Sequence, residues 1–102
     1  MIKARFKTCV GQIVSLEISG HADSAPHGED LVCALVSGVA FGLCNAVNEL
    51  CGIEDIEIGD NVVRIRIDKP TTVSEAVMRT GLIQLQTAAE QSKYLKIKVT
   101  EV

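Results

Sequence analysis

Aromatic residues are scarce in this sequence, which has no tryptophan, two phenylalanines and one tyrosine. Proteins that stack single-stranded nucleic acid need exposed aromatic rings, so the scarcity argues against that class. The formal net charge of −3 points the same way, because a general nucleic-acid binder normally carries a strongly basic face. We therefore expect no direct binding of nucleic acid.

Proline is also rare, with two residues, and 47% of the 102 residues are hydrophobic. This composition excludes an intrinsically disordered chain. A chain of this length can bury one core without disulfides or metals. No linker or low-complexity tract interrupts it, so we predict a single domain over residues 1–102.

The N-terminal segment lacks the continuous apolar core of a signal peptide, because MIKARFKTCV alternates charged and apolar residues. Residues 31–48 are uncharged but contain serine, glycine and asparagine, whereas a membrane span needs about 20 predominantly apolar residues. We expect a buried core helix there and a cytoplasmic protein. Thiols stay reduced in that compartment, so we expect free cysteines at Cys9, Cys33, Cys44 and Cys51.

Alternating apolar and polar residues predict five strands. The first covers residues 2–10, with Ile2, Ala4, Phe6, Thr8 and Val10 on one face. The others centre on residues 14–18, 56–58, 63–67 and 95–99.

Two helices complete the pattern. Residues 19–28 are expected to form a loop, followed by a helix over about 29–50 that ends at Gly52. Thr72 and Glu75 have the spacing of a capping box before a second helix over about 73–91. Met78, Leu82, Leu85 and Ala89 form its apolar stripe. The order ββαββαβ predicts an α+β fold, with a mixed or antiparallel sheet and two helices packed on one face.

Reactive side chains crowd into residues 21–33, namely His21, Asp23, His27, Glu29, Asp30 and Cys33. A thiolate is the nucleophilic form of cysteine. The start of the first helix and a loop histidine would both favour a thiolate at Cys33, whereas Glu29 and Asp30 would oppose it. Cys44 and Cys51 have no histidine nearby and are expected to be core or structural residues, and Cys9 to be incidental.

Three other interpretations compete with a catalytic cysteine. Cys33 could be a small buried hydrophobe. His21, Asp23, His27 and Cys33 could bind zinc, although paired Cys-x-x-Cys or His-x-x-x-His elements are missing. The loop between Gly20 and Gly28 could bind an anion at the helix start, but it is acidic and lacks a phosphate-loop pattern. We expect no metal and no cofactor.

Two stretches carry a specific pattern: Gly20-His21-Ala22, and Gly28-Glu29-Asp30-Leu31-Val32-Cys33-Ala34 followed by Ser37. Their order, with the histidine and the cysteine twelve positions apart, closely resembles the signature of the bacterial ribosomal-processing cysteine proteases. The length of the chain and the predicted ββαββαβ order match that family as well.

The resemblance implies a cysteine endopeptidase that removes an N-terminal extension from large-subunit ribosomal protein twenty-seven. It implies that Cys33 is the nucleophile and His21 the proton donor, and that cleavage follows bulky apolar residues bound in an apolar groove. Backbone N–H groups around Cys33 are the expected oxyanion donors. Supporting or substrate-loop residues would be Gly20, Ala22, Gly28, Asp30 and Ser37.

Two of those supporting residues have open roles. Asp30 could orient the imidazole or cap the helix. Ser37 could bond near the thiol or could simply allow close packing. His27 lies where family members vary, so it receives no role.

A non-enzymatic function is the alternative: a ribosome-associated binding or assembly factor that acts through a basic sheet face. Seven basic residues occupy outward strand positions, namely Lys3, Arg5, Lys7, Arg64, Arg66, Lys96 and Lys98. We favour ordinary cross-strand pairing of these residues with Glu17, Asp55 and Glu57, at roughly 0.2–1 kcal/mol for each pair. The expected partners are the extended ribosomal protein as substrate and a second copy of the chain in a homodimer, with no membrane.

Overall fold

The computed structural model describes residues 1–20 and 27–102, with the backbone alone for residues 27–30. The elements follow the predicted order: β1 (Ile2–Cys9), β2 (Gln12–Ser19), α1 (His27–Cys51), β3 (Ile56–Ile58), β4 (Val62–Arg66), α2 (Thr72–Glu90) and β5 (Leu95–Glu101).

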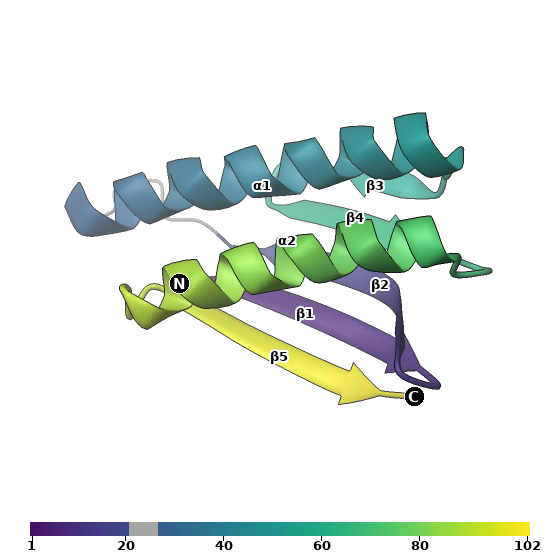
Figure 1. Cartoon of the computed structure of the whole chain (residues 1–102). Coiled ribbons are helices and arrows are strands. Elements are labelled where there is room, and N and C mark those ends of the chain that lie inside the picture. The colour runs from purple at the N-terminus through teal and green to yellow at the C-terminus, as the bar shows by residue number, and fades with distance from the viewer. Residues whose placement is uncertain (21–26) are drawn as a thin grey trace.

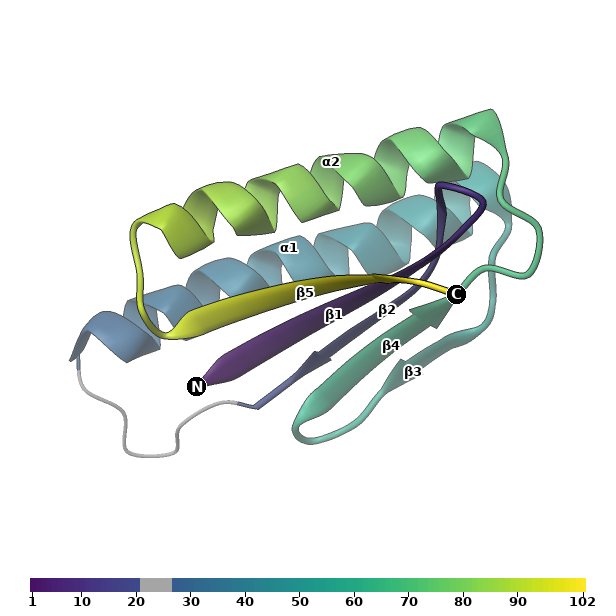
Figure 2. The same cartoon turned by 90° about the horizontal axis from the view of Figure 1, so that it is seen from below.

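The five strands form one sheet in the order β3-β4-β2-β1-β5. Neighbouring strands are antiparallel except for β1 and β5, which run parallel, so the sheet is mixed. Both helices cover one face of it (Figure 1), and the view from below shows the other face uncovered (Figure 2). The predicted α+β class and the predicted layer arrangement are confirmed.

One hydrophobic core lies between the sheet and the helices. Alternate residues of the central strands point into it, and each helix contributes one stripe at a spacing of three and four residues. Gly81 lets the helices approach closely, because a Cβ there would overlap the methyl groups of Leu43. The largest buried core side chains include Phe6, Ile2, Ile13, Leu16, Ile65, Met78, Leu85 and Val47.

The turn between β1 and β2 differs from the prediction. Val10 was expected on the buried face, but β1 ends at Cys9, and Val10 lies in the turn with a φ of 51° and 88% exposure. The Glu101 carboxylate accepts hydrogen bonds there from the Thr8 hydroxyl and from the N–H groups of Val10 and Gly11. These bonds, above all the one from Thr8, lower the pKa of Glu101.

The predicted capping box is shifted by one residue. Thr71 is the N-cap of α2: its side chain accepts a hydrogen bond from the N–H of Ser74, whose side chain accepts one from the N–H of Thr71. Glu75 is therefore free for another contact. Its carboxylate accepts a hydrogen bond from the N–H of Ile13 at 2.7 Å and pairs with Arg79, which ties the start of α2 to β2.

Helix α1 begins two residues before its predicted start, so His27 and Gly28 belong to the helix rather than to the loop. The expectation of a buried core helix is right for one face only. That face packs into the core, whereas Leu31, Leu35 and Phe41 remain about half exposed or more. By length and composition alone, Leu31–Cys51 could cross a membrane, but a core helix passes the same test.

Candidate active site

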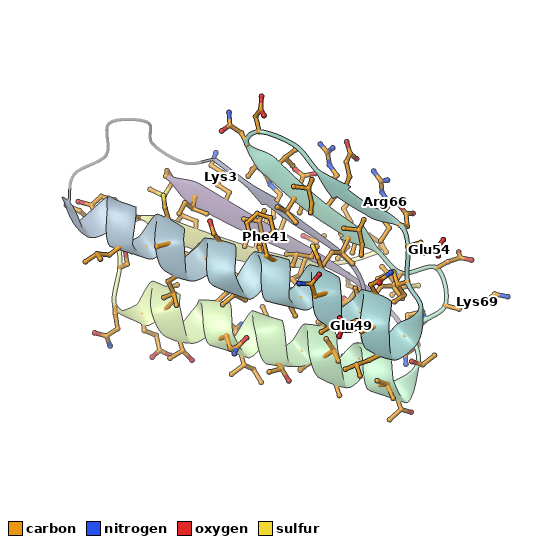
Figure 3. All side chains as sticks on the ribbon, turned by 90° about the horizontal axis from the view of Figure 1, so that it is seen from above. Lys3, Phe41, Glu49, Glu54, Arg66 and Lys69 are labelled. Carbon is orange, nitrogen blue, oxygen red and sulfur yellow. The ribbon has the colours of Figure 1, made fainter. Side chains whose placement is uncertain are left out.

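Cys33 is partly exposed and lies on the face of α1 that is turned toward the sheet. Val36, Ser37, Ala40 and Phe41 follow it at separations of three, four, seven and eight residues and line the same cavity. This spacing defines one stripe of a helix. Figure 3 shows Phe41 on the side of α1 that is turned away from α2.

The cavity beside Cys33 has a volume of about 240 Å³. Its other walls come from Ile2 at the start of β1, from Ile18 and Gly20 around the end of β2, and from residues 59–63, which form the β3–β4 turn and the start of β4. Aliphatic side chains and Phe41 dominate this lining. The thiol is therefore placed beside a surface suited to apolar side chains.

Gly20 lies at the wall of this cavity, at a position that only glycine fits without strain. Its φ is +87°, a conformation that side chains disfavour, and a Cβ there would meet the backbone carbonyl oxygen of Met1. Its N–H donates to the carbonyl of Asn61 at 3.1 Å. Gly20 therefore fixes the chain between β1 and the β3–β4 turn, immediately before His21.

The other three cysteines have different surroundings. Cys44 is 5% exposed, and burial raises the pKa of its thiol. Cys9 is exposed, and Cys51 is the last residue of α1. Cys33, by contrast, is partly exposed and lines the cavity described above.

The early start of α1 corrects two expectations about Cys33. The residue is the seventh of the helix counted from His27, about 9 Å along the axis from the first. The electrostatic effect of a helix terminus falls off within the first turn, so it contributes little at Cys33. Only the first four N–H groups of a helix lack an acceptor within it, and Cys33 lies beyond these four.

Several predicted site residues cannot be placed. His21 and Ala22 lie outside the described residues, and for Gly28 and Asp30 only the backbone, in the first turn of α1, is described. Their roles stay predictions. The described residues contain no group of three metal-binding side chains, but His21, Asp23 and His27 lie outside that search, so the zinc alternative is not tested.

Ser37 is the supporting residue whose side chain is described. It lines the cavity together with Cys33, but its hydroxyl makes no hydrogen bond to Cys33 or to any other described residue. The sequence pattern predicts a hairpin turn at Gly59, Asp60 and Asn61, but it gave no sign that this turn lines the cavity beside Cys33. The helical spacing from Cys33 could have found Val36, Ala40 and Phe41, whereas no sequence signal placed the turn beside them.

The predicted pairing on the outward sheet face is confirmed for the arginines. Glu17 pairs with Arg5 at 3.3 Å and with Arg64 at 2.9 Å. Arg64 also pairs with Glu57, and Arg66 with Asp55 at 3.6 Å. The hydrogen bond from Arg64, followed by the charges of Arg64, Arg5 and Lys7, lowers the pKa of Glu17.

Comparison with protein families and curated sequences gives consistent matches. Residues 1–96 match the family described as cysteine protease Prp. The chain is 52% identical over 50 residues to the ribosomal processing cysteine protease Prp of Bacillus subtilis, covering 48% of this chain and 45% of that protein. It is 34% identical over 85 residues to the protein of that name from Staphylococcus aureus, covering 79% of this chain and 80% of the relative.

Solved structures agree in fold. An essential ribosomal processing protease Prp from S. aureus, in complex with a substrate peptide, superposes with a TM-score of 0.88 at 28% identity, covering 97% of this chain and 99% of that one. The S. aureus protease with a covalently linked product peptide gives 0.84 at 30% identity with the same coverage.

Proposed function

This chain belongs to the cysteine protease Prp family, and we propose that it is an endopeptidase that removes the N-terminal extension of large-subunit ribosomal protein twenty-seven during ribosome maturation. Its curated relatives are named as ribosomal processing proteases. The observation that carries the proposal is the position of Cys33 at the wall of an apolar cavity.

The proposed reaction is nucleophilic catalysis by Cys33 with His21 as acid and base. The Cys33 sulfur forms a bond with the scissile carbonyl carbon, the carbon–nitrogen bond breaks, and His21 protonates the departing amine. His21 then takes a proton from water, which hydrolyses the thioester and frees the thiol. A covalently linked product peptide in the S. aureus relative supports a route through a covalent intermediate.

The cavity also supports the proposed substrate. Cleavage after bulky apolar residues requires an apolar surface beside the nucleophile. Ile2, Ile18, Val36, Phe41 and Val63 supply such a surface within reach of Cys33. The β3–β4 turn adds the side chains of Asp60 and Asn61 at the rim, where polar groups can fix the orientation of a bound peptide.

Incubation with the N-terminally extended ribosomal protein tests this function. Mass spectrometry should show one shortened product with the wild-type chain and none with Cys33→Ala. A Cys33→Ala chain that still produces the shortened protein contradicts the proposal. A chain that binds the extended protein without cutting it would instead favour the non-enzymatic alternative.

We also propose that the chain acts in the cytoplasm as a homodimer, with the outer face of α1 against a second copy. Leu31, Leu35 and Ile83 line a groove of about 540 Å³ between α1 and α2 and are more than half exposed. Exposed apolar patches of this kind mark interaction surfaces.

Leu35→Glu should give a monomer in analytical ultracentrifugation, whereas Ile58→Glu, at an equally exposed apolar position on β3, should leave the dimer intact. A wild-type monomer would contradict this assembly.

A further inference from the structure

The uncovered face of the sheet concentrates positive charge in a chain that is acidic as a whole. Seven of the ten basic residues occupy its outward strand positions, against Glu17 and Glu57 on the face and Asp55 at its rim. Seven cations and three anions leave a surplus of four positive charges among the described residues of this face. The formal net charge of the whole chain is −3.

The three carboxylates of this face form ion pairs with the arginines. Arg5, Arg64 and Arg66 have carboxylate partners within 3.6 Å. The four lysines of the face have none among the described residues. They are Lys3, Lys7, Lys96 and Lys98, of which Lys7 still acts through its charge on Glu17.

The strand register places three of these lysines beside other cations. Because β1 and β5 are parallel and in register, Lys96 lies next to Lys3 and Lys98 lies next to Arg5. Like charges directly opposite each other on neighbouring strands destabilise a sheet. A bound polyanion would remove this repulsion.

A shallow hollow of about 180 Å³ lies within the same face. Its lining carries the cations of Arg5, Lys7, Arg64 and Arg66 and the carboxylate of Glu17, which pairs with Arg5 and Arg64. The strand register sets Ser15 between Lys7 on β1 and Arg66 on β4, and the Ser15 hydroxyl makes no hydrogen bond to a described residue. Two cations with a hydroxyl between them match the charge and the hydrogen-bonding needs of a phosphate group.

The composition of the face favours a nucleic-acid backbone over a protein partner. Protein interfaces depend on buried aromatic or aliphatic anchors, and the three aromatic residues of the chain lie elsewhere: Phe6 in the core, Phe41 on α1 and Tyr94 before β5. Without exposed rings the face cannot stack bases. Charge and hydroxyl contacts to phosphates are sequence-independent contacts.

We infer that the uncovered sheet face is a second binding site, which holds the phosphate backbone of helical RNA through Lys3, Lys7, Lys96, Lys98 and the hollow around Ser15. The choice of RNA as the polyanion rests on the proposed action on a ribosomal protein, whose surroundings are RNA. The site lies on the face of the sheet opposite the helices, so it can hold RNA while the cavity beside Cys33 holds a peptide. It differs from the expectation of no nucleic-acid binding, which rested on the net charge and on the scarcity of aromatic residues.

The test measures binding of a short fluorescent RNA duplex by anisotropy between about 50 and 200 mM salt. Lys96→Gln/Lys98→Gln removes two charges from the face. Lys69→Gln/Lys93→Gln removes the same charge from positions off the face and is the matched control. Circular dichroism checks the fold of both variants, and cleavage of an apolar peptide checks the protease site separately.

The face variant should bind the duplex roughly tenfold more weakly near 100 mM salt, and its salt slope should fall by about 2, because each lost phosphate contact contributes about 0.9. The control should bind like the wild type, and both variants should cleave peptide normally. Equal losses in the two variants, or no binding by the wild type at low salt, would overturn the inference. Tighter binding of polyglutamate than of RNA would also overturn it and would indicate an acidic protein partner. A wild-type chain that binds the RNA duplex but does not cleave the peptide would contradict only the proposed protease function.

Discussion

Cys33 and Cys44 stand on the same face of one helix, yet their surroundings differ completely. They are eleven residues apart in α1, which corresponds to about three turns, so their side chains leave the helix in nearly the same direction. Cys33 is partly exposed and lines a cavity, whereas Cys44 is 5% exposed in the core.

The difference comes from what lies across from each thiol. Opposite Cys33 lie Gly20, just past the end of β2, and the β3–β4 turn, and these elements and α1 enclose a space of about 240 Å³. Cys44 instead belongs to the continuous core cluster. Burial keeps Cys44 as a neutral thiol by raising its pKa. The exposure of a thiol in this helix therefore depends on the facing elements more than on the helix itself.

The largest expected effect separates the two thiols by activity. Cys33→Ala should lower kcat/KM for the extended substrate by at least about 10³-fold, because nucleophile removal abolishes the covalent route. Cys44→Ala should keep wild-type kinetics and lose about 1 kcal/mol of unfolding free energy, a typical cost of a core truncation. Steady-state kinetics with chemical denaturation measures both. Comparable kinetic losses in the two variants would contradict the assignment of Cys33, rather than Cys44, as the nucleophile.

The next effect concerns His21, the proposed acid and base for Cys33. His21→Ala should reduce cleavage by about 10²–10⁴-fold, the usual range for a proton-transfer residue. His27→Ala changes the other histidine, at the first residue of α1, and should have little effect. Kinetics on both variants decides the matter, and an equal loss from each would show that the wrong histidine was chosen.

A smaller effect is expected at the boundary of the cavity. Gly20→Ala and Gly11→Ala both place a side chain at a positive φ, a strain of about 1–3 kcal/mol. At Gly20 the added Cβ also meets the carbonyl of Met1, whereas nothing lies within 4 Å at Gly11. Denaturation should show the larger loss for Gly20→Ala, and only that variant should lose cleavage. Matching kinetics in the two glycine variants would mean that Gly20 does not position the site.

The smallest effect is the pH dependence of stability due to Cys44. Folding favours its neutral thiol, so this contribution is complete below the ordinary pKa of 9.0 and is lost as the pH rises through 9.0 toward the raised folded value. The unfolding free energy of the wild type should therefore fall relative to that of Cys44→Ala above pH 9.0. Parallel curves for the two chains would show that burial does not perturb this thiol.

The sequence predicted the fold well because its patterns were strong. In β1, buried and exposed residues alternate strictly, and in α2 the apolar residues Met78, Leu82 and Leu85 form one stripe. Each pattern allowed only one face of its element to be buried. The failures are local: Val10 follows the alternation but lies in the turn, and the capping role passes from Thr72 and Glu75 to Thr71 and Ser74. In the turn, the carboxylate of Glu101 accepts a hydrogen bond from the N–H of Val10. At the start of α2, the carboxylate of Glu75 accepts one from the N–H of Ile13. In both places a contact between distant parts of the sequence decides the local geometry.

The candidate site was only partly predictable. The motif identified Cys33, and helix periodicity implies its neighbours on α1. The β3–β4 turn reaches the cavity only because β4 pairs with β2, a pairing between strands distant in the sequence. The sequence pattern placed the lysines on the outward face, but it could not show that Lys96 lies next to Lys3, because this proximity arises from the parallel register of β1 and β5.

Thiol labelling tests the central claim, that Cys33 is the activated nucleophile, most directly. The native chain is treated with limiting iodoacetamide at neutral pH, and peptide mapping follows the modification of each cysteine while cleavage activity is measured in parallel. Cys33 should react first, Cys44 last, and the fraction of activity lost should equal the fraction of Cys33 modified. Faster labelling of Cys9 or Cys44, or full modification of Cys33 with cleavage retained, would contradict the account.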